Sequence, residues 1–358
     1  YTRYELQQLK RAVQRGWLRM LGSPLVMPDA ENANQDEARD VEQTRLISQV
    51  QRLIASKLDL EAQEEDPLIP LCIDEASAAG FFFLYRRIFE EMDGGLVAFK
   101  FLYRRGLNLL LYDCGGGTTD ICLVNASVPD SLNILRVEVL ARGGIRDFGG
   151  DDITRELCRL LKAKLAVLLA KFANQPLAGI AVPPDSEQVF ALNELPARAK
   201  VLQEFIDKVA RADREDIWVP TKDIPGRPDD QRRQRALALW RMGEALKAEL
   251  QTKEVVKLPP LNRETNALTQ AIFSASGTAA QIQALTSELE RLTIRRQDLD
   301  ALILQPAKRS IDVCNKIIAK IFSEKGRPDE VHWVVASGNA VKYPFLQSLL
   351  KSQLCVPN

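Results

Sequence analysis

The sequence predicts an α/β protein in which helices pack against a sheet. Short apolar runs bounded by turn residues alternate with longer segments in which apolar residues recur every three or four positions. Three apolar runs follow one another closely, at 107–112, 121–127 and 133–141, separated by a glycine turn and by a turn at Pro129 and Asp130. This order predicts an antiparallel meander.

The N-terminal part of the chain predicts two helices and a strand. Apolar residues have helical spacing at 4–21 and again within 29–66, where we expect the charged faces to be solvated. The run 68–73 predicts a short buried strand. Because the chain starts at Tyr1 rather than at methionine, we interpret it as a fragment.

A helix is predicted at 74–92, directly before the meander, with a carboxylate at its start and small residues in its first turns. The aromatic side chains of this segment are expected to lie in the core, namely Phe81, Phe82, Phe83 and Tyr85.

After the meander the sequence predicts mostly helices. Their expected positions are 153–172, 231–251, 279–299, 305–322 and a last segment that ends near Leu354. Two further strands are predicted: one at 254–261, and a buried one at 331–338 that ends in a glycine turn. Residues 174–235 mix prolines, charges and apolar patches, and PGRPDD at 225–230 predicts an exposed loop.

Composition and charge narrow the function. Lys and Arg number 48, as do Asp and Glu, so the balanced charge does not favour nucleic acid or an anionic membrane as the main partner. No apolar run approaches the roughly 20 residues of a membrane helix. The six cysteines form no CxxC pair, which disfavours zinc or thioredoxin-type chemistry and favours a reducing, cytoplasmic location. The only histidine, His332, is expected to be a packed or edge-strand residue.

The stretch 109–124, LLLYDCGGGTTDICLV, places three glycines between two predicted strands. Glycine lets a backbone approach a ligand closely, and successive amides in such a turn form a concave anion site. The candidates for holding phosphate are therefore Gly115, Gly116, Gly117 and Thr118.

Two carboxylates, Asp113 and Asp120, bracket this turn. They would repel bare phosphate, but Mg²⁺ commonly takes one or two carboxylates together with phosphate oxygens. The pattern therefore favours a metal-bound nucleotide over a plain glycine hairpin, which is the structural alternative. It differs from the GxxxxGK[ST] phosphate loop because it lacks the lysine and a strand follows it.

DCGGGTTDICLV resembles the second phosphate motif of the actin-like ATPase superfamily, which includes actin, the DnaK-type chaperones and the bacterial proteins MreB, FtsA and ParM. Four further segments resemble motifs of this family in the family's order. They are the connecting helix at 73–85, the glycine–acidic step at 149–154, the E-x-x-K helix at 243–250 and the second adenosine motif at 334–350. The resemblance covers 68–354, and DEASAAGFFFLY also resembles the bacterial SrfB-type virulence-factor family.

The resemblance implies a two-lobed, ribonuclease H-like fold with an incomplete first lobe. Residues 1–112 would form the partial first lobe, with the connecting helix at 75–92. Residues 113–358 would form the second lobe, with a helical insert at about 174–300. ATP or ADP and Mg²⁺ would bind between the lobes.

The resemblance also implies roles for single residues. Asp113 would orient a water, Glu75 would lie near the γ-phosphate, and Thr118 would bind a phosphate oxygen. Asp113 and Asp120 would hold the metal. The remaining nucleotide contacts would come from Gly149, Gly150, Asp152, Glu244, Lys247, Ser337, Gly338 and Asn339.

Each of these assignments has a structural alternative. Glu75 and Asp152 could be carboxylates that favour a helix N-terminus. Glu244 and Lys247 could form a surface ion pair of little energetic value.

The implied function is an ATPase that couples ATP binding and hydrolysis to lobe closure and to a protein partner, or to self-association. The family's first phosphate hairpin and the chaperone lysine are absent, so we expect the chain alone to hydrolyse ATP poorly. Two alternatives stay open: a nucleotide-binding scaffold without hydrolysis, and a small-molecule kinase of the same superfamily.

Overall fold

The chain divides into two compact units, Tyr1–Asp74 and Glu75–Asn358. The computed structural model describes residues 75–355 of the second unit, except 130–133, 173–175, 184–189, 215, 223–228, 259–278 and 325–330. The two helices and the strand predicted before residue 74 lie outside the described residues. The described part is a mixed α/β structure with a four-stranded mixed sheet and eight α-helices.

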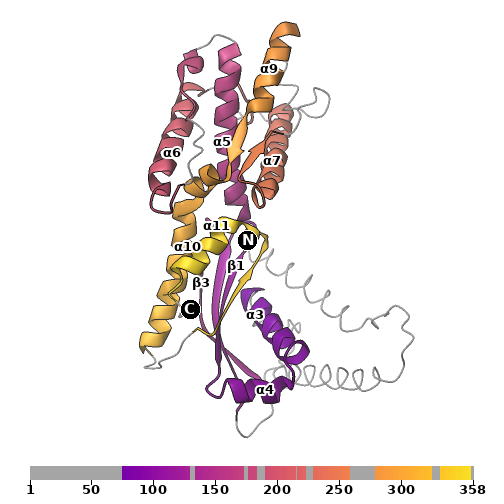
Figure 1. Cartoon of the computed structure of the whole chain (residues 1–358), viewed down its shortest axis with the longest axis vertical. Helices are drawn as coiled ribbons and strands as arrows, with labels where there is room; N and C mark the ends of the chain where they lie inside the picture. The colour runs from indigo at the N-terminus through magenta and orange to yellow at the C-terminus, as the bar shows by residue number, and fades with distance from the viewer. Residues whose placement is uncertain are drawn as a thin grey trace, which may run out of the picture. The chain divides into compact units, whose positions relative to one another are not determined.

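The predicted meander is confirmed. Its strands are β1 (Leu107–Cys114), β2 (Thr119–Ser127) and β3 (Arg136–Ile145), and each is antiparallel to the next. A late strand, β6 (Trp333–Ser337), pairs with β1 in parallel, so the sheet order is β3-β2-β1-β6 (Figure 1). We expected β6 to be buried, but it is the edge strand of the sheet and its residues alternate between half-buried and exposed.

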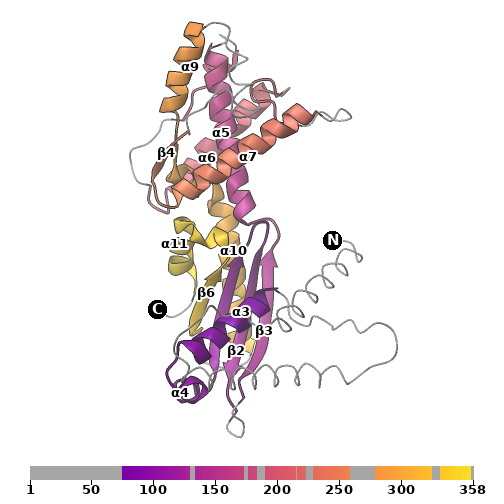
Figure 2. The ribbon, with the colours of Figure 1, turned by 90° about the vertical axis from the view of Figure 1, so that its right-hand side faces the viewer.

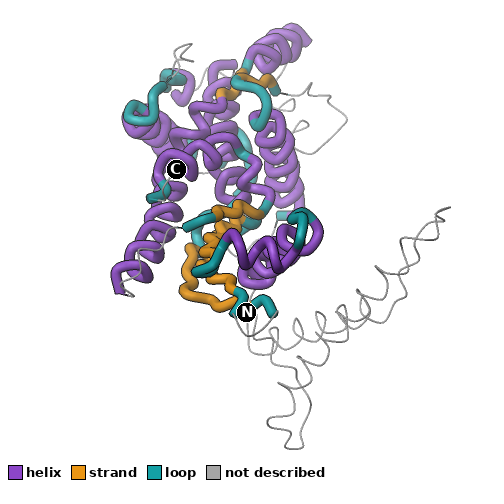
Figure 3. Tube along the Cα trace, turned by 60° about the horizontal axis from the view of Figure 1, so that its bottom comes forward, coloured by secondary structure: helices purple, strands orange, loops and turns teal. Residues whose placement is uncertain are grey.

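Both faces of β1 are covered, which explains why its sequence is apolar almost throughout. Successive side chains of a strand point to opposite faces. Leu107, Leu109 and Leu111 belong to a core with the helices that precede the sheet, whereas Leu110 and Tyr112 belong to a core with the later helices. Figure 3 shows helices on both sides of the strands.

The first face is covered by α3 (Glu75–Tyr85), a π-helical turn (Arg86–Glu90) and α4 (Gly95–Leu102). The expected helix at 74–92 is therefore confirmed, with a change of winding near its end. Leu84 and Ile88, which are four residues apart, are fully buried against the sheet.

The prediction that the aromatic cluster of this helix is buried was wrong in part. Phe81 is 46% exposed and Phe82 is 64% exposed, whereas the buried positions of this segment include Gly80, Leu84 and Ile88. Phe83 is half-buried and contacts Trp333 edge-on.

The second face is covered by α10 (Arg296–Glu324), whose Ser310 hydroxyl lies 2.7 Å from the Tyr112 hydroxyl of β1. The other helices gather beyond the end of the sheet at which the β1–β2 turn lies (Figures 1 and 2). They are α5 (Gly150–Phe172), α6 (Leu195–Ala212), α7 (Asp230–Leu250) and α9 (Ala279–Arg291). A last helix, α11 (Pro344–Gln353), follows β6.

Four predictions for this later part need correction. The single helix expected at 279–299 is two helices, because a short strand, β5 (Thr293–Arg295), separates α9 from α10 and pairs with β4 (Val255–Lys257). α6 was not predicted, although its apolar residues recur with helical spacing. The helix expected at 305–322 starts earlier, because α10 begins at Arg296. Of the loop expected at 225–230, residues 225–228 lie outside the described residues, Asp229 caps α7 and Asp230 is its first residue.

His332 is part of the sheet edge, as expected. Its backbone amide donates to the Asn108 carbonyl at 2.9 Å, and its Nδ1 accepts from the Asn108 amide at 3.0 Å. Within the part of the chain that the structure describes, we find no helix with the length and apolar character needed to span a membrane.

Candidate functional site

The glycine run forms the tight turn between β1 and β2. Cys114 and Thr119 are the last paired residues, and the Gly115 amide donates to the Thr118 carbonyl at 2.9 Å. Gly116 and Gly117 at the tip are exposed, and within the described residues their amides have no hydrogen-bond acceptor. The turn therefore presents two free backbone donors to solvent, which is the arrangement that an anion site requires.

The start of α5 packs directly against this turn. The Gly150 amide donates to the Gly115 carbonyl at 2.8 Å, and the Asp151 amide donates to the Gly116 carbonyl at 2.7 Å. A Cβ atom at Gly149 would lie 2.3 Å from the Gly116 carbonyl oxygen, so only glycine permits this approach. The first amides of α5 thus fix the shape of the turn and are not free for a ligand.

Asp113 and Asp120 lie directly opposite each other on β1 and β2, one residue pair from the turn. The Thr118 hydroxyl donates to Asp120 at 3.1 Å. Burial raises the pKa of Asp113, the Ser337 hydroxyl opposes this shift, and the charge of Asp120 adds to it. A cation between the two carboxylates would relieve their repulsion.

The end of β6 brings the predicted adenosine motif to the same place. Ser337 is paired with Asp113 across the parallel β1–β6 ladder. Gly338 has a φ of 88°, and a Cβ atom there would lie 2.0 Å from the Cys114 carbonyl oxygen. Glycine is therefore required at this position. The exposed Asn339 directly follows Gly338, just after the end of β6.

The predicted E-x-x-K pair lies on α7 and reaches the start of α5. The Lys247 ammonium donates to the Gly150 carbonyl at 3.1 Å, to the Thr154 hydroxyl at 2.7 Å and to Glu244 at 2.7 Å. Partial burial would raise the pKa of Glu244, but hydrogen bonds from Lys247 and Thr154 lower it overall. The pair is thus a link between two helices at the site and not an isolated surface ion pair.

The structure gives no support for a nucleotide contact by two of the predicted site residues. Asp152 is half-buried in the first turn of α5 and forms an ion pair with Arg155, which matches the structural alternative for this residue. Glu75 is the first residue of α3, and its side chain is outside the described part.

Sequence reasoning missed two threonines that hold the site together. The Thr119 hydroxyl donates to the Phe148 carbonyl at 2.8 Å and so ties the turn to the segment before α5. Thr154 contacts both members of the Glu244–Lys247 pair. Both stand within the predicted motifs, but a hydroxyl alone gives no signal of its partner in sequence.

Within the described residues no group of three or more metal-ligating side chains occurs, so a metal here would rely on Asp113, Asp120, water and ligand oxygens. No protein-family model matches the sequence. The fold and the site thus define a mixed α/β protein with a glycine turn, two opposed carboxylates and a helix-borne Lys–Glu pair at one end of its sheet.

Proposed function

We propose that this chain is a nucleotide-binding domain of the actin-like ATPase type, with a ribonuclease H-like sheet. One observation carries the proposal: four separate segments meet at one end of the sheet. The glycine turn contacts the start of α5, α5 contacts Lys247 of α7, and Gly338 contacts the end of β1. Packing alone does not require all four to carry polar or glycine residues at this point.

The residues present fit a magnesium nucleotide. The free amides of Gly116 and Gly117 would bind phosphate oxygens, and Asp113 and Asp120 would hold the metal directly or through water. A metal held there would neutralise part of the phosphate charge. Ribose or base would lie toward Ser337–Asn339 and the Glu244–Lys247 pair, which flank the turn.

In this proposal ATP binding and hydrolysis drive closure of two lobes and change the affinity for a protein partner. Phosphoryl transfer depends on positioning and charge neutralisation more than on covalent chemistry. A half-buried carboxylate beside the phosphates, Asp113, is suited to orient a water. The protein partner would bind or leave because its affinity differs between the closed and the open state.

Calorimetry of the full chain with MgATP tests the proposal. We expect heat of binding that EDTA abolishes, and we expect Asp113→Ala to lose the dependence on metal. Asp312→Ala is the matched control, because it removes an exposed carboxylate from α10, away from the turn.

Absence of binding by the wild-type chain, or unchanged metal dependence in Asp113→Ala, would contradict the proposal. Binding without phosphate release in a parallel turnover assay would instead identify a nucleotide-binding scaffold.

A further inference from the structure

A groove lies beside the free edge of the sheet. β6 pairs with β1 on one side, and no other described strand pairs with its opposite side (Figure 2). A cavity of about 1010 Å³ lies here, between β6, the turn that follows it and α11. The residues that line it are Val334, Ala336, Gly338, Asn339, Val341, Lys342, Gln347, Leu350, Lys351 and Leu354.

The floor of the groove is apolar. Val334 and Ala336 are alternate residues of β6, so both side chains lie on the same face of the strand, and Val334 is 39% exposed. Leu350 and Leu354 of the α11 segment line the facing wall. An unpaired strand edge beside an apolar groove is the arrangement to which extended peptides add as a further strand.

The rim of the groove is positively charged. Lys342 and Lys351 are both exposed, and neither forms an ion pair with any residue that the structure describes. No carboxylate lines the groove. The lysines therefore favour an occupant with acidic side chains.

We propose that this groove binds an extended polypeptide segment that carries apolar residues at alternate positions and acidic residues on the same face, at either end of the apolar stretch. The segment pairs with the free edge of β6, its apolar side chains enter the groove, and its carboxylates meet Lys342 and Lys351. This proposal is independent of the proposed nucleotide function. Gly338 and Asn339 line the groove and also belong to the candidate nucleotide site, so the test is done without nucleotide.

The test uses the full chain and a fluorescein-labelled decapeptide in which the valines at alternate positions are flanked, on the same face of the strand, by glutamates. We expect saturable binding, together with slower hydrogen exchange of the β6 amides in the complex. Lys342→Glu/Lys351→Glu should weaken binding about tenfold, because two attractions become repulsions. A peptide with lysine in place of glutamate should regain affinity for this variant.

Two further variants complete the design. Ala336→Trp fills the groove and should abolish binding, with circular dichroism to confirm that the variant is folded. Lys200→Glu/Lys208→Glu, at exposed positions of α6, makes the same charge change away from the groove and should bind normally.

Absence of binding, equal affinity for the valine–lysine peptide in the wild-type chain, or no change in β6 exchange would overturn the proposal. A dimer of the chain in sedimentation that Ala336→Trp dissociates would also overturn it, in favour of a second copy as the occupant.

Discussion

Two glycines set the geometry of the candidate site at the level of single residues. Gly149 lets the start of α5 touch the β1–β2 turn, and Gly338 lets the end of β6 touch the end of β1. Any side chain at these positions would overlap backbone atoms, which cannot move away as a flexible side chain can. These glycines therefore determine whether the separate segments can meet.

Gly338→Ala should lower the free energy of unfolding by at least about 2 kcal/mol, because it adds backbone strain at positive φ to an overlap with the Cys114 carbonyl. Chemical denaturation measures the change. Gly179→Ala is the control, since no atom lies within 4 Å of the Cβ position there. Equal stability of the two variants would show that β6 does not end as described.

Single-residue features could be predicted from the sequence where they depend on residues close together in the chain. The turn of 115–118, the opposition of Asp113 and Asp120, and the one-turn spacing of Glu244 and Lys247 all followed from residue type and spacing. The partners of Thr119 and Thr154 did not, because a hydroxyl can bond to many acceptors and the choice depends on tertiary packing.

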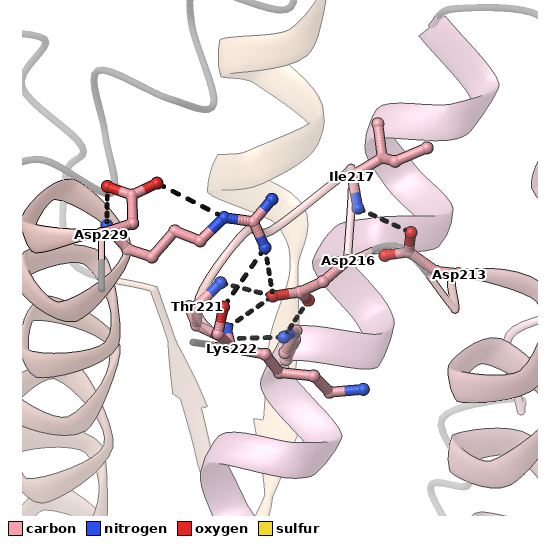
Figure 4. Close-up of polar contacts among 8 residues, drawn as sticks. Asp213, Asp216, Ile217, Thr221, Lys222 and Asp229 are labelled. Atoms are coloured by element: carbon pink, nitrogen blue, oxygen red, sulfur yellow. Dashed lines mark hydrogen bonds and ion pairs between the residues drawn. The ribbon is translucent and has the colours of Figure 1, made fainter. Parts of the chain in front are cut away.

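At the level of elements, one buried carboxylate connects α5, α7 and the loop between α6 and α7. Asp216 is 2% exposed and has a φ of 56°, which aspartate tolerates better than most residues. Its carboxylate accepts from the amides of Thr221 and Lys222, both at 2.6 Å (Figure 4), and forms an ion pair with Lys162 of α5. Arg232 of α7 lies 3.7 Å away.

Burial alone would raise the pKa of Asp216, but the hydrogen bonds from Lys162 and the two amides lower it overall. A lowered folded-state pKa gives stability that is fully present above the unfolded pKa of about 3.9, and that is lost as pH falls through the folded-state value. The network should therefore stabilise the helices at neutral pH and fail in acid.

Asp216→Asn should cost about 3 kcal/mol at pH 7, because it removes the buried counter-charge of the half-buried Lys162 ammonium. The difference from wild type should narrow as pH falls below about 4. Urea titrations at several pH values measure both effects. Asp207→Asn is the control, because it removes a half-exposed carboxylate from α6. A stability difference between Asp216→Asn and wild type that stays constant with pH would contradict the role given to Asp216.

The prediction of helices and strands succeeded where a single hydrophobic period, that of a helix or that of a strand, runs through a long segment. The meander, α5 and α7 were expected close to their observed positions, whereas the helix expected at 305–322 covers only the later part of α10. No separate helix was predicted at the position of α6, because prolines and charges mix with the apolar residues of this region. Pro196 stands in the first turn, where a helix accepts it. The break between α9 and α10 depends on the pairing of β5 with β4, which local periodicity does not reveal.

At the level of the whole described unit, the sheet and its helices bring together segments that are more than two hundred positions apart in the chain. Asp113 and Ser337 are paired across β1 and β6. The edge position of β6 follows from this topology and could not be predicted from its apolar sequence, which suits a buried strand equally well. The same edge position creates the groove beside α11.

The central claim is that a magnesium nucleotide binds where these segments meet. Hydrogen exchange of the full chain, with and without MgATP, tests the location most directly, because bound ligand slows the local opening that exchange reports. We predict protection in three separate segments, 115–118, 149–154 and 337–339, and its loss when EDTA is added. Exchange that is unchanged in these segments at saturating MgATP, or protection confined to other parts of the chain, would contradict the account.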